Sequence, residues 1–271
     1  MNILLTALIG LGSGGFFLEK AVVSAAHSNG KRKARRDFLE KAVIEVENVS
    51  KVYDMGKVQV RALDGVSLSV NRGDFVSIMG PSGSGKTTLL DVLSALMRPT
   101  SGEVYINGRA ISRMDDNQLA RVRGQTIGFV FQTFNLIPRM SALENVMLPL
   151  WFQGKPLEKR REIAEKILQE VGLGERIGHR PSELSGGQRQ RVAIARALAV
   201  SPDVIVADEP TGNLDSVSGE QILEIIKNLN EKHGKTVLMV THEEEVARMA
   251  QKIVYLKDGK IVKTEKQTRR R

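Results

Sequence analysis

The stretch GPSGSGKT at residues 80–87 decides the fold of this 271-residue chain. It matches the phosphate-loop pattern GxxxxGK[ST], in which a glycine-rich turn leads into a helix. The apolar run FVSIM comes before it, and the helical pattern KTTLLDVLSAL follows from Lys86. A strand, a loop and a helix in this order predict a site for the phosphates of a nucleoside triphosphate.

Each residue type in the loop has a chemical reason to be there. Gly80, Gly83 and Gly85 let the backbone curl so that successive N–H groups point at phosphate oxygens. The helix that begins near Lys86 directs its positive dipole end at the same place. We expect Lys86 to contact the β- and γ-phosphates and the Thr87 hydroxyl to bind Mg²⁺. The other loop residues expected to contact the nucleotide are Ser82, Ser84 and Thr88.

A second apolar run, VIVADE at residues 204–209, ends in two acids. Ligands of a parallel sheet bind beyond the carboxyl ends of its strands, so we expect both acids near the phosphates. Asp208 is placed to hold Mg²⁺, directly or through water. Glu209 is placed to orient the attacking water or accept its proton. An Asp-Glu pair after a strand is often only a turn, and the phosphate loop is what favours the catalytic interpretation.

Strands and helices alternate along most of the chain, which predicts an α/β fold with a parallel sheet covered by helices. Two alternating segments come first, with Asp64-Gly65 as a turn signal, and they predict an antiparallel β subdomain. Residues 130–200 are typical of a mostly helical insertion. The expected strands are 43–53, 58–70, 75–80, 203–208 and 236–241, and the expected helices are 85–96, 158–171, 186–199, 216–232 and 243–251.

The formal net charge of +9 is concentrated at the two ends. Residues 1–41 hold seven Lys/Arg against three Asp/Glu, and residues 263–271 hold five against one. Nucleic-acid affinity rises with the number of phosphates neutralised by a folded face, so we expect no nucleic-acid partner. The basic ends are either solvated or in contact with anionic lipid headgroups. The absence of cysteine excludes disulfides and thiolate chemistry, and four histidines argue against a His-based metal cluster.

The first eighteen residues carry no charged side chain. The apolar run from Ile3 to Leu18 would span ~24 Å as a helix, short of a ~30 Å hydrocarbon core. No positive region precedes it, as a secretory signal would require. The basic run at 31–36 would, by the positive-inside rule, leave the rest of the chain in the cytoplasm. Three interpretations stay open: a membrane-associated or partner-packed segment, a flexible extension, and a translation start placed too early.

The segment LSGGQ at residues 184–188 resembles the signature of ABC-type ATPases, a class of phosphate-loop proteins. Ser185, Gly186 and Gly187 open a helix and are expected to present N–H groups to a γ-phosphate, with Gln188 beside them. Alone, the segment would be only a serine N-cap followed by two flexible glycines. Together with the two preceding motifs, it indicates an anion site.

The resemblance assigns further residues one at a time. Gln132 matches the Q-loop glutamine, which in the family reaches Mg²⁺ and the attacking water, beside the docking groove for the membrane subunit. His242 matches the H-loop histidine that contacts the γ-phosphate. Asp215 matches the D-loop acid, and Asn213 stands where the family usually has a small residue. Tyr53 matches the aromatic residue that stacks on adenine, with a plain surface or core position as its alternative.

Within this family the chain is most similar to the ATPase subunits of lipoprotein-releasing and macrolide-exporting systems (LolD/MacB-like). The segments that carry this likeness are 128–138, 142–146 and 210–215. The resemblance runs from about Val43 to Lys263. We therefore expect an ABC ATPase domain at 42–263, with a helical subdomain at about 130–200, an apolar then basic extension at 1–41, and a basic tail at 264–271.

The resemblance implies an ATPase at the cytoplasmic face of a membrane. Two copies would form a head-to-tail dimer in which each signature closes over the partner's ATP and Mg²⁺. Hydrolysis would open the dimer and drive transport or extraction by separate transmembrane permease subunits. A regulatory ATPase of the cell-division type, which signals through a membrane partner without transport, is the alternative. A ribosome- or DNA-acting member is disfavoured, because the chain has neither two ATPase domains nor a long coiled-coil insertion.

Overall fold

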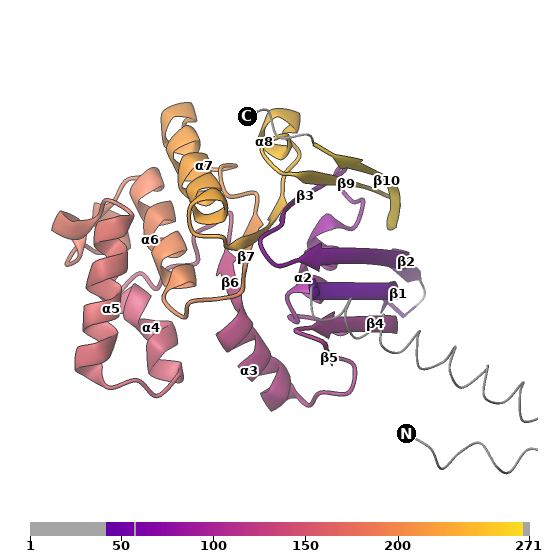
Figure 1. The fold of residues 1–271 in the computed structure, drawn as a ribbon, viewed down its shortest axis with the longest axis horizontal. Coiled ribbons are helices and arrows are strands. Elements are labelled where there is room, and N and C mark those ends of the chain that lie inside the picture. The colour runs from indigo at the N-terminus through magenta and orange to yellow at the C-terminus, as the bar shows by residue number, and fades with distance from the viewer. Residues whose placement is uncertain (1–41, 57, 268–271) are drawn as a thin grey trace, which may run out of the picture. The chain divides into compact units, whose positions relative to one another are not determined.

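The computed structural model describes residues 42–56 and 58–267. The predictions made for residues 1–41 and 268–271 lie outside this described part. Within it, no helix is both long enough and apolar enough to cross a membrane. Two β-sheets and a group of helices make up the fold, and the α/β class is confirmed (Figure 1).

The first sheet is antiparallel and has the strand order β2-β1-β4-β5. It begins with the long hairpin of β1 (Ala42–Asp54) and β2 (Gln59–Asn71), as the alternating pattern predicts. β4 (Ser101–Ile106) and β5 (Arg109–Ala110) extend it on the other side of β1. These two short strands were not predicted from the sequence.

The second sheet has the order β10-β9-β3-β8-β7-β6. β3 (Phe75–Met79), β8 (Thr236–Val240) and β7 (Val204–Asp208) lie side by side and parallel at its centre. Their side chains are almost all buried, which explains their continuous apolar sequences. The flanking strands are β6 (Ile127–Val130), β9 (Lys252–Lys257) and the antiparallel edge strand β10 (Lys260–Lys266), which runs past the expected domain boundary at 263.

Helices cover the parallel sheet or form a separate group. α4 (Ala142–Phe152), α5 (Leu157–Glu170) and α6 (Gly186–Leu198) share a hydrophobic core of their own, which confirms a helical insertion. The others are α2 (Lys86–Leu93), α3 (Asp116–Thr126), α7 (Ser216–Glu231) and α8 (Glu244–Ala247). α8 is much shorter than the helix expected at 243–251, and α3 was not predicted.

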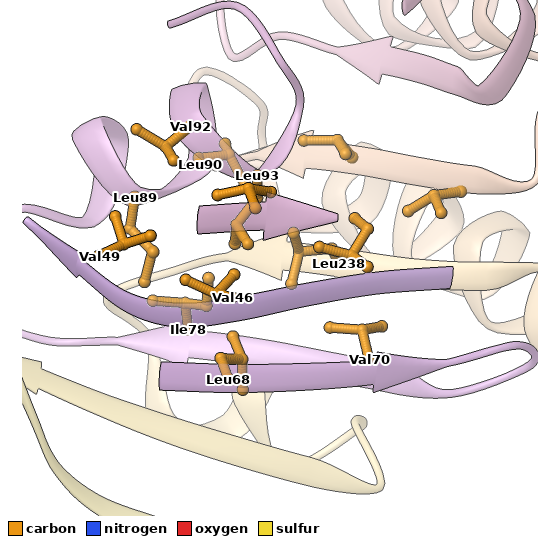
Figure 2. Close-up of a cluster of buried hydrophobic side chains, with 14 of the residues drawn as sticks. Val46, Val49, Leu68, Val70, Ile78, Leu89, Leu90, Val92, Leu93 and Leu238 are labelled. Atoms are coloured by element: carbon orange, nitrogen blue, oxygen red, sulfur yellow. The ribbon is translucent and has the colours of Figure 1, made fainter. Parts of the chain in front are cut away.

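The two sheets and α2 meet in one hydrophobic core. Figure 2 shows side chains from β1, β2, β3, α2 and β8 converging there, among them Val46, Leu68, Ile78, Leu90 and Leu238. All five are less than 10% exposed. Because α2 begins directly after the glycine-rich loop, this packing holds the start of the helix in a fixed position relative to the strands.

The turn expected at Asp64-Gly65 is wrong. β2 continues through these residues, and the pairing with β1 shifts register there. Gly65 has a φ of +67°, so the dipeptide forms a β-bulge in which glycine supplies the left-handed conformation. The chain reverses earlier, where the Met55 N–H donates to the Val58 carbonyl oxygen over 3.0 Å.

A buried amide organises the entry to the helical group. Asn145 on α4 is fully buried, its Oδ1 accepts from the Ile137 N–H at 2.8 Å, and its Nδ2 donates to the Met140 and Ser141 carbonyl oxygens at 3.1 and 3.0 Å. We expect Asn145→Ala to reduce the free energy of unfolding by about 2–3 kcal/mol, because several buried polar groups lose their partner at once. Urea denaturation followed by circular dichroism measures this.

Asn117→Ala is the matched control, since Asn117 lies exposed near the start of α3. Its effect should stay within about 0.5 kcal/mol. Equal effects of the two variants would show that the buried network around α4 does not carry the stability assigned to it.

Candidate functional site

The strand register brings the motif residues to one edge of the parallel sheet. Ile78 on β3 pairs with Val240 on β8, and Val240 pairs with Asp208 on β7. The residues that follow these positions therefore leave the sheet at the same level. On the outer side, Val130 on β6 pairs with Ala207, which places the segment after β6 beside the end of β7. This register brings Asp208 and Glu209 to the same edge of the sheet as the glycine-rich loop, which is why both acids were expected near it.

The loop between β3 and α2 depends on its glycines for contacts that a side chain would block. Gly85 has a φ of +98°, and a Cβ on it would lie 2.3 Å from the Ala62 carbonyl oxygen. A Cβ on Gly80 would lie 2.2 Å from the Leu256 carbonyl oxygen. Gly83 also has a positive φ, of +77°. The loop is thus pressed between β2 and β9 in a conformation that only glycine tolerates.

The first turn of helix α2 has N–H groups available to bind an anion. Its first residue is Lys86, and no side chain caps the preceding Gly85. The N–H groups of a first helical turn have no partner within the helix, so an uncapped start at a cleft fits a phosphate group. The Lys86 ammonium donates to the carbonyl oxygens of Gly80 and Pro81, both at 2.9 Å, which holds its charge under the loop. The Ser84 hydroxyl is buried without a hydrogen-bond partner.

A cleft of about 620 Å³ opens over this loop. Residues of the loop line one side of it, and Glu209 and His242 line another. Tyr255 on β9 also lines the cleft and was missed by the sequence analysis. Its pairing with Met79 places it beside the loop, a signal that becomes visible only once the order β9-β3 is known.

Asp208 lies in an environment that suits a cation. Burial raises the pKa of its carboxyl group, the charges of Glu209 and Asp91 raise it further, and Lys86 lowers it. Burial likewise raises the pKa of Asp91. Carboxyl groups whose pKa is raised by burial and by neighbouring negative charge are of the kind that a divalent metal ion would stabilise in the charged form. Asp91 was missed, although it stands four residues after Thr87 and so shares that face of α2.

The Glu209 carboxylate pairs with the His242 side chain, with 3.1 Å between Oε1 and Nδ1. Glu209 has a φ of +42°, an uncommon value for a residue other than glycine, and the Glu209 N–H is fixed by the Val240 carbonyl oxygen at 3.0 Å. Strained backbone of this kind is concentrated at functional sites. The Gln132 amide comes from the neighbouring segment, and a Cβ on Gly212 would lie 2.6 Å from its Nε2 atom. Strand order thus brings Gln132 next to the end of β7.

Tyr53 lies on β1 near the other end of the loop. It is half-buried, and its hydroxyl lies 3.5 Å from the Thr88 hydroxyl and donates to the Met97 sulfur at 3.2 Å. Thr87 is exposed. The structure therefore places the Tyr53 hydroxyl beside Thr88 in the first turn of α2, and the stacking of Tyr53 on adenine stays a prediction.

The signature segment is built as a helix start. The Ser185 hydroxyl accepts from the Gln188 N–H at 3.2 Å, and the Gln188 side chain accepts from the Ser185 N–H at 2.9 Å. This capping box is the structural alternative weighed in the sequence analysis, and it is present. A Cβ on Gly186 or Gly187 would lie 3.2 Å from Leu214 Cδ2 or 2.8 Å from Ser218 Oγ, so both glycines also serve close packing.

Several of the expected site residues do not line the cleft. Tyr53, Thr87, Gln132 and Asp208 lie outside its lining, and among the described residues that line it, none belongs to the signature segment at 185–188. Asp215 caps α7, accepting from the Ser218 N–H at 2.9 Å, and this hydrogen bond lowers the pKa of its carboxyl group. Within one copy of the chain, neither the signature segment nor Asp215 lines the cleft over the glycine-rich loop.

Comparison with known proteins gives a consistent result. The family model described as ABC transporter matches residues 63–212. An uncharacterized ABC transporter ATP-binding protein of Thermotoga maritima is 55% identical over 82% of this chain and 94% of its own length. A macrolide export ATP-binding/permease protein, MacB, of Syntrophobacter fumaroxidans is 50% identical over 81% of this chain and 31% of its own length.

A solved structure also matches over the described part of the chain. It is the dimer of the cassette MJ0796 in a post-hydrolysis state with ADP and Pi, and MJ0796 is a protein of Methanocaldococcus jannaschii. The TM-score is 0.78 at 50% identity, covering 83% of this chain and 99% of that one. The fold with an antiparallel subdomain, a parallel core and a helical insertion is thereby confirmed. The chain belongs to the family of ABC transporter ATP-binding proteins.

Proposed function

We propose that this protein is the ATP-binding and ATP-hydrolysing subunit of an ABC transporter, working as a head-to-tail dimer. The observation that supports this best is the convergence in one cleft of an uncapped helix start, Lys86 and the Glu209–His242 pair. A phosphate site and a carboxylate that can accept a proton from water are two of the parts that ATP hydrolysis uses.

The residues that line the cleft and those expected to lie near it would divide the chemistry between them. Lys86 and the N–H groups at the start of α2 would bind the β- and γ-phosphates, and Tyr53 would stack on the adenine. Mg²⁺, held by Thr87, Gln132 and Asp208, would neutralise charge on the phosphates. Glu209 would accept a proton from water as the water oxygen bonds to the γ-phosphorus and the bond to ADP breaks. His242 would hold Glu209 in place and donate to the γ-phosphate.

The position of the signature segment, outside the cleft of its own chain, supports a dimer. The signature at the start of α6 has a glycine-rich tip, and Ser185 is exposed, yet it does not line the cleft of its own chain. The MJ0796 cassette, 50% identical in structure alignment, is dimeric with ADP and Pi. We infer that Ser185, Gly186, Gly187 and Gln188 of one copy close over the ATP held by the other, with Asp215 at the same interface.

The absence of cysteine allows a direct test of this arrangement. We expect the double variant Ser82→Cys/Ser185→Cys to form a disulfide-linked dimer under mild oxidation with ATP, because each exposed Ser82 would face the partner's Ser185. The product is measured on a non-reducing gel. Each single variant is the control and should remain monomeric. Cross-linking of the single variants to the same extent, or none of the double variant with ATP, would contradict the head-to-tail dimer.

A separate groove supports a permease partner. It has a volume of about 1320 Å³, lies between α3, α4 and α6, and is lined by apolar side chains that include Phe129 and Phe152. Among the described residues that line it, four are cationic and none is acidic: Arg121, Arg123, Lys155 and Arg196. Exposed aromatic side chains, Trp151 and Phe152, end α4 beside it. An apolar helix with acidic residues from a membrane subunit would fit this lining.

Docking there would place the protein at the cytoplasmic face of a membrane. Co-purification of a membrane protein would support this partner. Nucleotide-stimulated movement of a substrate in reconstituted vesicles would then separate a transporter from a regulatory ATPase of the cell-division type.

A further inference from the structure

The segment that carries Gln132 is held in place through its backbone carbonyl groups. Two bonds lie within the segment: the Thr133 carbonyl oxygen accepts from the Asn135 N–H at 2.6 Å, and the Phe131 carbonyl oxygen accepts from the Phe134 N–H at 3.4 Å. The other bonds come from side chains of two distant segments: Gln190 donates to Phe131, Asn213 to Gln132, and Arg196 to Phe134 and Asn135. Phe134 and Asn135 have positive φ values of 61° and 48°. This strained loop therefore depends on bonds from outside for its shape.

Two of the three side chains belong to α6. Gln190 is fully buried and binds both the Phe131 carbonyl oxygen at 3.3 Å and the Pro210 carbonyl oxygen at 2.8 Å. Arg196 is one turn and a half further along the helix. Asn213 is the exception, because it comes from the segment between β7 and α7.

Asn213 and its neighbour hold Gln132 at two points. The Asn213 Nδ2 donates to the Gln132 carbonyl oxygen at 3.1 Å. The Gln132 side-chain nitrogen rests so close to Gly212 that a Cβ there would be 2.6 Å away. The backbone of Gln132 thus contacts Asn213, and its side chain contacts the preceding residue, Gly212. Because Gly212 has no Cβ, the Gln132 side chain can approach it closely, and the hydrogen bond from the Asn213 amide holds the Gln132 backbone in place.

The same segment contacts the signature. Leu214, next to Asn213, lies against Gly186, with 3.2 Å between its Cδ2 atom and the position of a Cβ on that glycine. Residues 212–214 therefore connect Gln132 on one side with the start of α6 on the other. A small side chain at position 213 would keep the contact to α6 and lose the hydrogen bond to Gln132.

We propose that Asn213 is a positioning residue for Gln132, and that it couples the placement of the Gln132 amide to the signature end of α6. This proposal rests on the function proposed above, in which Gln132 serves its own cleft and the signature serves the partner's. Asn213 touches neither nucleotide in this account. Asn213 acts through the orientation of Gln132. Because Asn213 is exposed, we expect its substitution to change that orientation without destabilising the fold.

Two variants test the contact in the nucleotide-free protein. Asn213→Ala removes the donor, and Asn213→Asp keeps the shape but sets an acceptor against the Gln132 carbonyl oxygen. We expect both to speed amide hydrogen exchange in residues 131–135 by about tenfold, without a change in the denaturation midpoint. Ser216→Ala, an exposed change just beyond Asp215, is the control and should leave exchange there unaltered.

Turnover then separates positioning from a general structural effect. We expect Asn213→Ala to reduce kcat about tenfold with KM for ATP unchanged, because a misplaced polar group affects the reacting geometry more than binding. In a Gln132→Ala background, Asn213→Ala should reduce kcat no further. Unchanged exchange at 131–135, or a full additional loss of kcat in that background, would overturn the proposal. The exchange result stands whether or not the protein hydrolyses ATP, so failure of the proposed function is distinguishable.

Discussion

Lys86→Ala is expected to reduce the affinity for ATP at least about a hundredfold, which corresponds to ~3 kcal/mol. Lys86 as a whole residue is only 8% exposed, and its ammonium group donates to the Gly80 and Pro81 carbonyl oxygens beside the cleft. A buried cation with fixed geometry loses little entropy when a triphosphate arrives, so its contribution to binding is large. Its removal also leaves Asp208 without the positive charge that offsets it, and this further disfavours an anionic ligand.

Isothermal titration calorimetry with ATP measures the effect. Lys235→Ala is the matched control, because the Lys235 ammonium also donates to one backbone carbonyl oxygen, that of Pro202, but outside the cleft. We expect the control to bind ATP like the unchanged protein. Undiminished ATP binding by Lys86→Ala would show that the glycine-rich loop is not the phosphate site.

The strand-loop-helix unit around Lys86 was predictable because the interactions that form it join residues close together in the sequence. An apolar run, glycines at fixed spacing and a helical pattern are neighbours in the sequence, and the structure places β3 and α2 on either side of the loop. The acids after β7 were also predictable, since the carboxyl ends of parallel strands meet at one edge. The continuous apolar sequences of the centre strands favoured a parallel sheet.

Two Asp-Gly pairs show that the local sequence does not decide between a turn and a β-bulge. Asp64-Gly65 was expected to be a turn and is a bulge, whereas Asp258-Gly259 forms the turn between β9 and β10. The two touch each other: the Asp64 N–H donates to the Gly259 carbonyl oxygen at 2.9 Å, and Lys260 pairs with Asp64 at 3.1 Å. The same dipeptide permits both conformations, and the tertiary contact selects one of them.

Residues that reach the site through strand order could not be predicted. Tyr255 lines the cleft because β9 pairs with β3, a neighbour more than 170 residues earlier in the chain. The contact between Asn213 and Gln132 joins segments 81 residues apart, and nothing in either segment's own pattern indicates it. The short β4 was missed for a related reason, since it pairs with distant residues of β1, and the two-residue β5 pairs only with β4.

Glu209→Gln is expected to slow ATP turnover by about a hundredfold or more while ATP binding is retained. The amide keeps the size of the carboxylate and the hydrogen-bonding reach toward His242, now 3.1 Å away, but it cannot accept a proton from water. ATP that binds and is not hydrolysed would continue to bridge two copies. The variant should therefore accumulate as a dimer with ATP, and size-exclusion chromatography measures it beside a steady-state phosphate-release assay.

Glu224→Gln on α7 is the control, because it makes the same chemical change outside the residues that line the cleft. It should hydrolyse ATP at the normal rate and form no lasting dimer. Adding Ser185→Arg to Glu209→Gln separates the two steps further: a bulky cation at the start of α6 should prevent the dimer and leave ATP binding by each monomer intact. Wild-type turnover by Glu209→Gln would remove Glu209 as the base. A dimer that survives Ser185→Arg would mean that the ATP between the two copies is closed by another surface than the signature.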